Sequence, residues 1–329
     1  MLATGVRSLA ILVTVVSVVC LIAVSCPRVT TPALPVALST AQSPGVPSAT
    51  TGNSSPDHEY FLVRTQVVAL GRRNITLPTL MYHYIRKPPS TRTDLLGYNL
   101  SVSPADFSAQ MDWLTLHGYH PVDFNDVREY FAGRQALPAK PVIITLDDGY
   151  ASLYTTAYPI LAMHGFKAVA YIVSGFIGWP RYVTASQIIE MDRAGIEIAA
   201  HTVDHADLAR MSGASLVHQL VDSKNALERL IGHPVVDFAY PSGKFNAEVV
   251  ARVRTAGYWS AATEITSTDH SMADRYTWTR VRVSGGEKLA EFVKELGAAM
   301  PSTTTSTVDV ESTYVPPPHL EMPTLAVIR

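Results

Sequence analysis

Cysteine is nearly absent from this 329-residue chain, and the two that occur, Cys20 and Cys26, lie close together near the N-terminus. The rest of the chain therefore has no thiol for a disulfide, a nucleophile or a metal ligand. Charge is also scarce, because Asp, Glu, Lys and Arg make up 16 % of the residues and the formal net charge is −2. No long basic run occurs, which argues against nucleic acid and against an electrostatic membrane patch. We expect small or uncharged partners.

The N-terminal segment has the pattern of an export signal. Arg7 precedes an apolar stretch at residues 9–24, and small residues follow it. The stretch is shorter than the roughly 20 residues of a membrane span, although an uncleaved anchor stays an alternative. The letters AVSC, which end at Cys26, are also similar to a lipoprotein cleavage site. We expect residues 1–26 to be a signal peptide, lipoprotein signal or N-terminal membrane anchor. The protein would then be secreted or held at the cell surface, with membrane contact only through this segment.

Two further segments show no apolar periodicity. Residues 27–57 are rich in Pro, Ser, Thr and Ala, and residues 301–329 begin with a similar polar stretch. Such compositions bury too little apolar surface to offset the entropy lost on ordering, so we interpret them as a disordered tether and a flexible tail. Residues 58–300 remain as one folded domain that is long enough to enclose a sizeable core. We expect this domain to be monomeric.

Within residues 58–300, short apolar runs alternate with segments of helical periodicity. Strands are predicted at 141–146, 166–174, 196–201, 235–241 and 258–263, and helices at 103–119, 150–165, 184–195, 214–232 and 247–257. Strand–helix units of this length predict parallel strands covered by helices, arranged as a barrel or as an open wound sheet. Both architectures place their active sites at the C-terminal ends of the strands.

Polar side chains gather at these predicted strand ends. Asp147 and Asp148 end the first of the five strands, and His201 ends the third, with His205 four residues later. His83 follows the apolar run LPTLMY, and a YPSG turn closes the fourth strand. Taken singly, each group is more often a turn or a structural residue than a site. Because parallel strands end at one rim, however, we expect these groups to lie together.

Two imidazoles and one carboxylate form the ligand set of a catalytic zinc site, with positions left open for water and substrate. His201 and His205 supply the imidazoles if the HTVDH segment forms a turn. Side chains of adjacent residues on an extended strand point to opposite faces, so Asp147 and Asp148 cannot easily bind one ion together. We therefore expect one aspartate to be a ligand and the other a base that takes a proton from the metal-bound water.

The segments TLDDGY, HTVDH and FAYPSGKFN, in this order and spacing, resemble the polysaccharide deacetylases of the NodB-homology type, carbohydrate esterase family 4. The resemblance extends over residues 79–283 through segments such as GFKAVAYIVSGFIG and RVRTAGYWSAAT. It implies an irregular (β/α) barrel of about seven strands. The opening LMYHYI is similar to the subgroup that deacetylates poly-N-acetylglucosamine.

The resemblance also assigns roles. Asp147 becomes the general base, and Asp148, His201 and His205 become ligands of a divalent metal ion, Zn²⁺ in the first place and Co²⁺ or Ni²⁺ as alternatives. The subgroup implies that His83 is the general acid that protonates the departing amine.

Two positions depart from the family pattern. Ala239 and Ser242 stand where an arginine and an aromatic residue are usual. The backbone N–H of Ser242 can still face an oxyanion, because a backbone donor does not depend on its side chain. Arg280, in the segment WTRVRV, would supply the missing guanidinium.

The resulting prediction is a metal-dependent hydrolase that removes N-acetyl groups from an N-acetylglucosamine-containing polysaccharide. An esterase that acts on O-acetyl groups, such as those of xylan, would use the same machinery and stays an alternative. A second alternative is a non-catalytic carbohydrate-binding relative, which the departures at Ala239 and Ser242 support. A glycosidase is disfavoured, because it needs two carboxylates about 5–9 Å apart on either side of the scissile bond.

Overall fold

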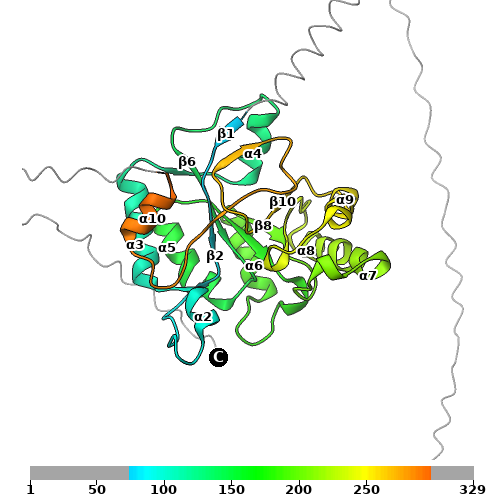
Figure 1. Cartoon of the computed structure of the whole chain (residues 1–329), viewed down its shortest axis with the longest axis horizontal. Helices are drawn as coiled ribbons and strands as arrows, with labels where there is room; N and C mark the ends of the chain where they lie inside the picture. Colours follow the sequence, from blue (N-terminus) through cyan, green and yellow to red (C-terminus); the bar gives the residue numbers. More distant parts are fainter. Residues whose placement is uncertain (1–73, 298–329) are drawn as a thin grey trace, which may run out of the picture. The chain divides into compact units, whose positions relative to one another are not determined.

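The computed structural model describes residues 74–297, and these form a domain of parallel strands and covering helices (Figure 1). The predicted N-terminal segment, tether and tail lie outside the described residues, as do both ends of the predicted 58–300 domain. Among the described residues, no helix combines the length and the apolar character that crossing a membrane requires.

The main sheet has seven parallel strands in the order β10-β9-β8-β7-β6-β2-β12. A short eighth strand, β5 (His120–Pro121), pairs with the start of β6. This sheet confirms the predicted (β/α) barrel of about seven strands. The strands are β2 (Thr79–Tyr82), β6 (Pro141–Leu146), β7 (Ala168–Ile172), β8 (Ile196–Ala200), β9 (Asp237–Ala239), β10 (Ser260–Ala262) and β12 (Val281–Arg282).

Helices occupy most of the connections between these strands. Ser103 and Thr184 cap α3 and α6, because each side chain accepts a hydrogen bond from a backbone N–H in the first turn. The predicted helices at 150–165 and 214–232 each contain a π-helical turn, at Leu153–Ala157 and His218–Asp222. The α-helices are α2 (Leu95–Asn99), α3 (Pro104–Leu116), α4 (Phe124–Phe131), α5 (Tyr158–Met163), α6 (Ala185–Arg193), α7 (Gly213–Val217), α8 (Ser223–Ile231), α9 (Ala247–Thr255) and α10 (Leu289–Glu295).

Two small sheets were not predicted from the sequence. The strands β1 (Asn74–Thr76) and β11 (Asp269–Ser271) form an antiparallel pair, and β3 (Tyr84–Ile85) pairs in parallel with β4 (Ser101–Val102). Strands of two or three residues are too short to show a hydrophobic period, so their pairing depends on contacts between distant segments.

One segment joins the two ends of the strand order. Trp278 donates its N–H to the carbonyl of Ala261 in β10, and Val283 donates its N–H to a carbonyl of β2. Between these contacts the chain forms β12, and Arg280 lies in the middle of the segment with its side chain fully buried. The chain path therefore carries this arginine into the interior of the sheet.

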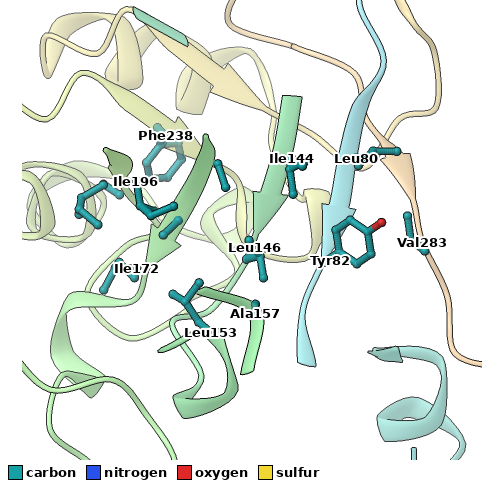
Figure 2. Close-up of a cluster of buried hydrophobic side chains, with 14 of the residues drawn as sticks. Leu80, Tyr82, Ile144, Leu146, Leu153, Ala157, Ile172, Ile196, Phe238 and Val283 are labelled. Atoms are coloured by element: carbon teal, nitrogen blue, oxygen red, sulfur yellow. The ribbon is translucent and has the colours of Figure 1, made fainter. Parts of the chain in front are cut away.

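Apolar side chains pack on both faces of the sheet, because successive strand residues point to opposite sides. On one face, Ile144 of β6 joins Tyr82 and Ile172 in a large buried cluster (Figure 2). On the other face, Ile143 belongs to a second cluster with Trp278. Each fully buried aliphatic side chain contributes roughly 1.5–3 kcal/mol. Packing on both faces holds the strand ends in fixed relative positions.

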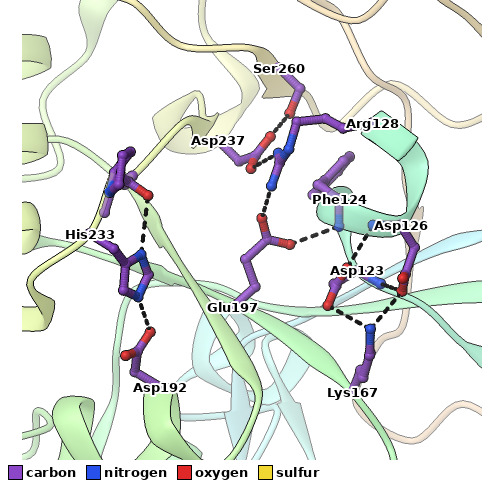
Figure 3. Close-up of polar contacts among 12 residues, drawn as sticks. Asp123, Phe124, Asp126, Arg128, Lys167, Asp192, Glu197, His233, Asp237 and Ser260 are labelled. Carbon is purple, nitrogen blue, oxygen red and sulfur yellow. Dashed lines mark hydrogen bonds and ion pairs between the residues drawn. The ribbon is translucent and has the colours of Figure 1, made fainter. Parts of the chain in front are cut away.

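Charged side chains connect the N-terminal ends of the strands to the start of α4 (Figure 3). Arg128 of α4 donates to Glu197 at 3.0 Å and to Asp237 at 2.5 Å, at the starts of β8 and β9. Phe124 donates its backbone N–H to Glu197, and Ser260 of β10 donates to Asp237. Lys167, just before β7, pairs with two acidic side chains of the α4 N-terminus. We call these groups the N-terminal rim network; its ionic members are Asp123, Asp126, Arg128, Lys167, Glu197 and Asp237.

Candidate metal centre and active site

The C-terminal ends of the strands open into a cavity of about 610 Å³. Arg280 alone among the seven residues predicted for the site does not line this cavity, because it is buried beneath the cavity wall. The other six predicted residues line it together: His83, Asp147, Asp148, His201, His205 and Ser242.

Asp148, His201 and His205 converge on one point of this cavity. One ligand atom from each of the three lies within 4.8 Å of the others. The Oδ1 atom of Asp148 is 3.3 Å from Nε2 of His201 and 3.2 Å from Nε2 of His205. Burial raises the pKa of Asp148, but the two imidazoles outweigh it and hold the pKa well below its ordinary value. The carboxylate is therefore ionised at neutral pH.

Neighbouring groups orient both imidazoles. Nδ1 of His201 lies 2.8 Å from the carbonyl oxygen of Ala239, which can only accept, so Nδ1 donates and Nε2 keeps its lone pair. The turn between the histidines is held by Thr202, whose hydroxyl accepts the backbone N–H of His205 at 2.9 Å. Thr202 and His205 have φ angles of 68° and 58°, a conformation that residues with side chains adopt at a cost. The predicted turn thus forms, but as a strained loop.

The three side chains fit a divalent cation. Two imidazole nitrogens and one carboxylate oxygen are the donors of a catalytic zinc site with open positions. The buried Oδ1 of Asp148 makes no hydrogen bond within the described residues, and such an oxygen is costly unless another partner binds it. Within residues 74–297, this is the one group of three or more His, Cys, Asp and Glu side chains with the arrangement of a metal site.

Asp147 is held separately from this trio. Arg280 donates from its two terminal nitrogens to Oδ1 and Oδ2 of Asp147, at 2.7 and 2.9 Å. The guanidinium is fixed in turn by the carbonyl of Thr263 at 2.8 Å and the hydroxyl of Thr145 at 3.1 Å. Burial raises the pKa of Asp147, but Arg280 together with His83 and His201 outweighs it and leaves the pKa below its ordinary value. This buried fork keeps the carboxylate ionised and fixes its orientation.

His83 lies beside the same carboxylate. Its Nε2 is 4.0 Å from Oδ2 of Asp147, and its ring is 8 % exposed where it lines the cavity. Burial lowers the pKa of His83 and outweighs Asp147 and Asp148, whose negative charges raise it. The imidazole is therefore close enough to meet a substrate placed next to Asp147.

Ser242 and several residues that the sequence reasoning missed complete the cavity wall. Ser242 has a φ of 52° in a tight turn after β9. Arg282 and Glu264 form an ion pair of 2.5 Å across the wall, and Tyr150 follows the aspartate pair. Arg282 stands two residues after Arg280, and this same-face spacing is the signal that could have found it. Glu264 carries no such signal.

The fold and the site together define a class: a hydrolase built on a (β/α) barrel, with a candidate metal centre beside a buried, ionised aspartate. A family model described as Polysaccharide deacetylase matches residues 134–261. The chain is 31% identical over 210 residues to "Putative polysaccharide deacetylase YxkH" of Bacillus subtilis (strain 168). The matched region covers 64% of this chain and 72% of that relative. The chain therefore belongs to the polysaccharide deacetylase family.

Further comparisons agree with this family. The poly-beta-1,6-N-acetyl-D-glucosamine N-deacetylase of Staphylococcus aureus (strain MSSA476) is 26% identical over 201 residues, which cover 54% of this chain and 68% of that relative. The solved structure of the Streptococcus pyogenes deacetylase PplD in complex with acetate matches with a TM-score of 0.63 and 26% identity, over 68% of this chain and 99% of that chain. The family, the fold class and the enzyme class, a hydrolase of amide bonds, are thus confirmed. The roles of single site residues stay predictions.

Proposed function

We propose that the protein removes N-acetyl groups from a polysaccharide that contains N-acetylglucosamine, and that it uses a divalent metal ion, Zn²⁺ in the first place. The main support for this proposal is that Asp148, His201 and His205 converge in one cavity, beside the ionised Asp147. The similarity to a poly-β-1,6-N-acetylglucosamine N-deacetylase supports the choice of sugar. The export signal predicted at residues 1–26 would bring the protein to a polysaccharide outside the cell.

A divalent ion held by the trio would supply two things: a water of pKa near roughly 7, and polarisation of the substrate carbonyl. In the proposed reaction, Asp147 accepts the proton of the attacking water, and Arg280 keeps the carboxylate facing the cavity. The backbone N–H of Ser242 stabilises the negative charge that develops on the carbonyl oxygen. The protonated form of His83 gives a proton to the amine nitrogen as the C–N bond breaks, so that acetate and a free amine leave. Because burial lowers the pKa of His83, this form is the minor one at neutral pH.

Acetate release from defined substrates tests this proposal. The purified protein is incubated with β-1,6-linked and β-1,4-linked N-acetylglucosamine oligomers and with O-acetylated xylan oligomers. Acetate and the mass of each oligomer are measured before chelation, after chelation, and after Zn²⁺, Co²⁺ or Ni²⁺ is added back. We expect metal-dependent acetate release from an N-acetylglucosamine oligomer. Release from the xylan oligomer alone would identify an O-acetyl esterase, and no release from any substrate would identify a non-catalytic relative.

A further inference from the structure

A row of aromatic side chains leads from the catalytic cavity to the protein surface. Tyr150 lines the cavity, and its ring stacks on that of Tyr84 with the centroids 3.6 Å apart. The ring of Tyr182 is a second neighbour of Tyr150, with the ring centroids 5.2 Å apart. Phe176 then lies 5.0 Å from both Tyr182 and Trp179. We call these five residues the aromatic row, and Trp179 is its outer end, with 57 % of its surface exposed.

The faces of the inner rings are in contact with neighbouring side chains, whereas Trp179 at the outer end has fewer ring neighbours. The guanidinium of Arg86 lies over Tyr84 at 3.7 Å, and Tyr150 has ring neighbours in Tyr84 and Tyr182. Among the described residues, Phe176 is the one ring neighbour of Trp179. The indole is therefore supported from beneath and still able to receive a flat ligand.

Backbone hydrogen bonds tie the loop of the outer rings to the catalytic turn. Val183 donates its N–H to the carbonyl of Gly149 at 2.9 Å, and Ala151 donates to the carbonyl of Arg181 at 2.7 Å. Gly149 directly follows Asp148, the carboxylate of the candidate metal centre. The position of the aromatic row relative to the reaction centre is consequently set by main-chain contacts, as a substrate-binding surface requires.

The chemistry of the outer end matches a sugar ring. A single exposed hydrophobic residue is ordinary on a protein surface, so the exposure of Trp179 alone would mean little. Its continuity with the cavity and its fixed position give it significance. The pyranose ring of a β-linked N-acetylglucosamine unit carries its substituents around its edge and presents C–H bonds on both faces. Such a face can pack on an indole while the hydroxyl groups stay in water.

We propose that Trp179 forms a sugar-binding subsite that holds a unit of the polysaccharide flanking the unit whose acetyl group is removed. This inference rests on the proposed function and adds a length requirement to it. Oligomers that reach from the cavity to Trp179 gain binding free energy, whereas a small acetylated compound that fills only the cavity gains none. The enzyme should therefore favour oligomers over short substrates through KM.

Three variants test the subsite. Trp179→Ala removes the ring, Trp179→Phe keeps a smaller flat ring, and Leu116→Ala is a matched control, since Leu116 is 81 % exposed and does not line the cavity. An N-acetylglucosamine pentamer and a small activated acetyl ester are the two substrates. We expect Trp179→Ala to raise KM for the pentamer about tenfold, with kcat and the turnover of the ester unchanged. Trp179→Phe should lose less, and Leu116→Ala should lose nothing.

Binding of the pentamer to an inactive background separates this inference from the proposed function. Asp147→Asn keeps the three proposed ligands, so calorimetry with this variant measures binding without turnover. A tenfold weaker Kd when Trp179→Ala is added would support the subsite even if no amide substrate were cleaved. An unchanged Kd, an unchanged pentamer KM, or equal losses on pentamer and ester would overturn it. Failure of the wild-type protein to release acetate would instead count against the proposed function.

Discussion

The two ends of the parallel sheet both contain buried charge, but they compensate it differently. At the N-terminal ends of the strands, Arg128 bridges Glu197 and Asp237, and a backbone N–H and a hydroxyl donate to the same carboxylates. At the C-terminal ends, Arg280 satisfies Asp147, whereas Oδ1 of Asp148 has no hydrogen-bond donor among the described residues. The buried carboxylates that join the strands to α4 are thus paired with donors. At the C-terminal ends, one carboxylate oxygen of Asp148 has no donor in the described part of the chain and is free to bind a cation.

The pKa of a buried carboxyl group is shifted in opposite directions at the two ends, up for Glu197 and down for Asp148. Burial raises the pKa of Glu197 well above its ordinary value, and the negative charge of Asp237 adds to this. Burial also raises the pKa of Asp148, but the imidazoles of His201 and His205 reverse the shift. A carboxylate that binds a metal ion must be ionised, and the direction of the Asp148 shift meets this requirement.

The largest expected effect separates the two ends directly. Asp148→Ala should remove bound metal and reduce acetate release to background, because two imidazoles are too few ligands for tight binding. Glu197→Gln, at the start of β8, should retain both metal and turnover. Metal content after dialysis and acetate release are measured on both variants. An active, metal-loaded Asp148→Ala protein would contradict the assignment of the trio, and metal loss in Glu197→Gln would remove the distinction between the two ends.

A second prediction divides the C-terminal end itself into groups that hold metal and groups that move protons. His83→Ala should keep the fold and the metal, yet lower kcat on amide substrates by about 10²–10⁴ through loss of general acid catalysis. An activated acetyl ester, whose leaving group needs no proton, should be affected far less. Kinetics on both substrates decide the point. Equal losses would mean that His83 supports structure or binding and is not the proton donor.

A third prediction concerns the N-terminal rim network. Arg128→Met leaves the carboxylates of Glu197 and Asp237 buried without their cation and should lower the free energy of unfolding by about 3–5 kcal/mol. Metal content and kcat at 25 °C should not change. Urea denaturation measures the loss, and adding Glu197→Gln and Asp237→Asn should restore part of it. Arg134→Met, which removes an exposed partner of Glu129, is the matched control and should leave stability unchanged. An equal effect of both arginine variants would contradict the role of the network.

The smallest expected effect is a pH dependence beside the N-terminal rim. His270 is buried against Trp278, with ring centroids 3.8 Å apart, and neither ring nitrogen has a hydrogen-bond partner among the described residues. Burial lowers the pKa of His270 to about 4, although Asp274 and Asp269 oppose the shift. The unfolded chain, with a histidine pKa near roughly 6.5, binds more protons between these values. The free energy of unfolding should therefore rise with pH from about 4 to 6.5, by at most about 3 kcal/mol.

His270→Phe, which packs on Trp278 but cannot titrate, should flatten this rise. Urea unfolding of the wild-type protein and of the variant at several pH values across the window measures the difference. The two proteins would show the same slope if the protonation of His270 did not differ between the folded and unfolded states.

The sequence predicts much of this molecule where the signals are local. The alternation of strands and helices follows from hydrophobic periodicity, and the capping side chains of Ser103 and Thr184 mark helix starts within a few residues. The letters of the DDG and HTVDH motifs place Asp147, Asp148, His201 and His205 at strand ends. Because all parallel strands end at one rim, the sequence alone predicts that these four residues lie together.

What the sequence by itself determined is therefore the fold class, the family and six of the side chains that line the cavity. The tertiary structure alone decided how those groups are held: the fork between Arg280 and Asp147, the Glu264–Arg282 pair, the aromatic row and the N-terminal rim network. The physical reason is range. Periodicity and helix caps involve residues a few positions apart in sequence. Arg280 and Asp147 are 133 positions apart, and no local pattern predicts that the chain brings them together.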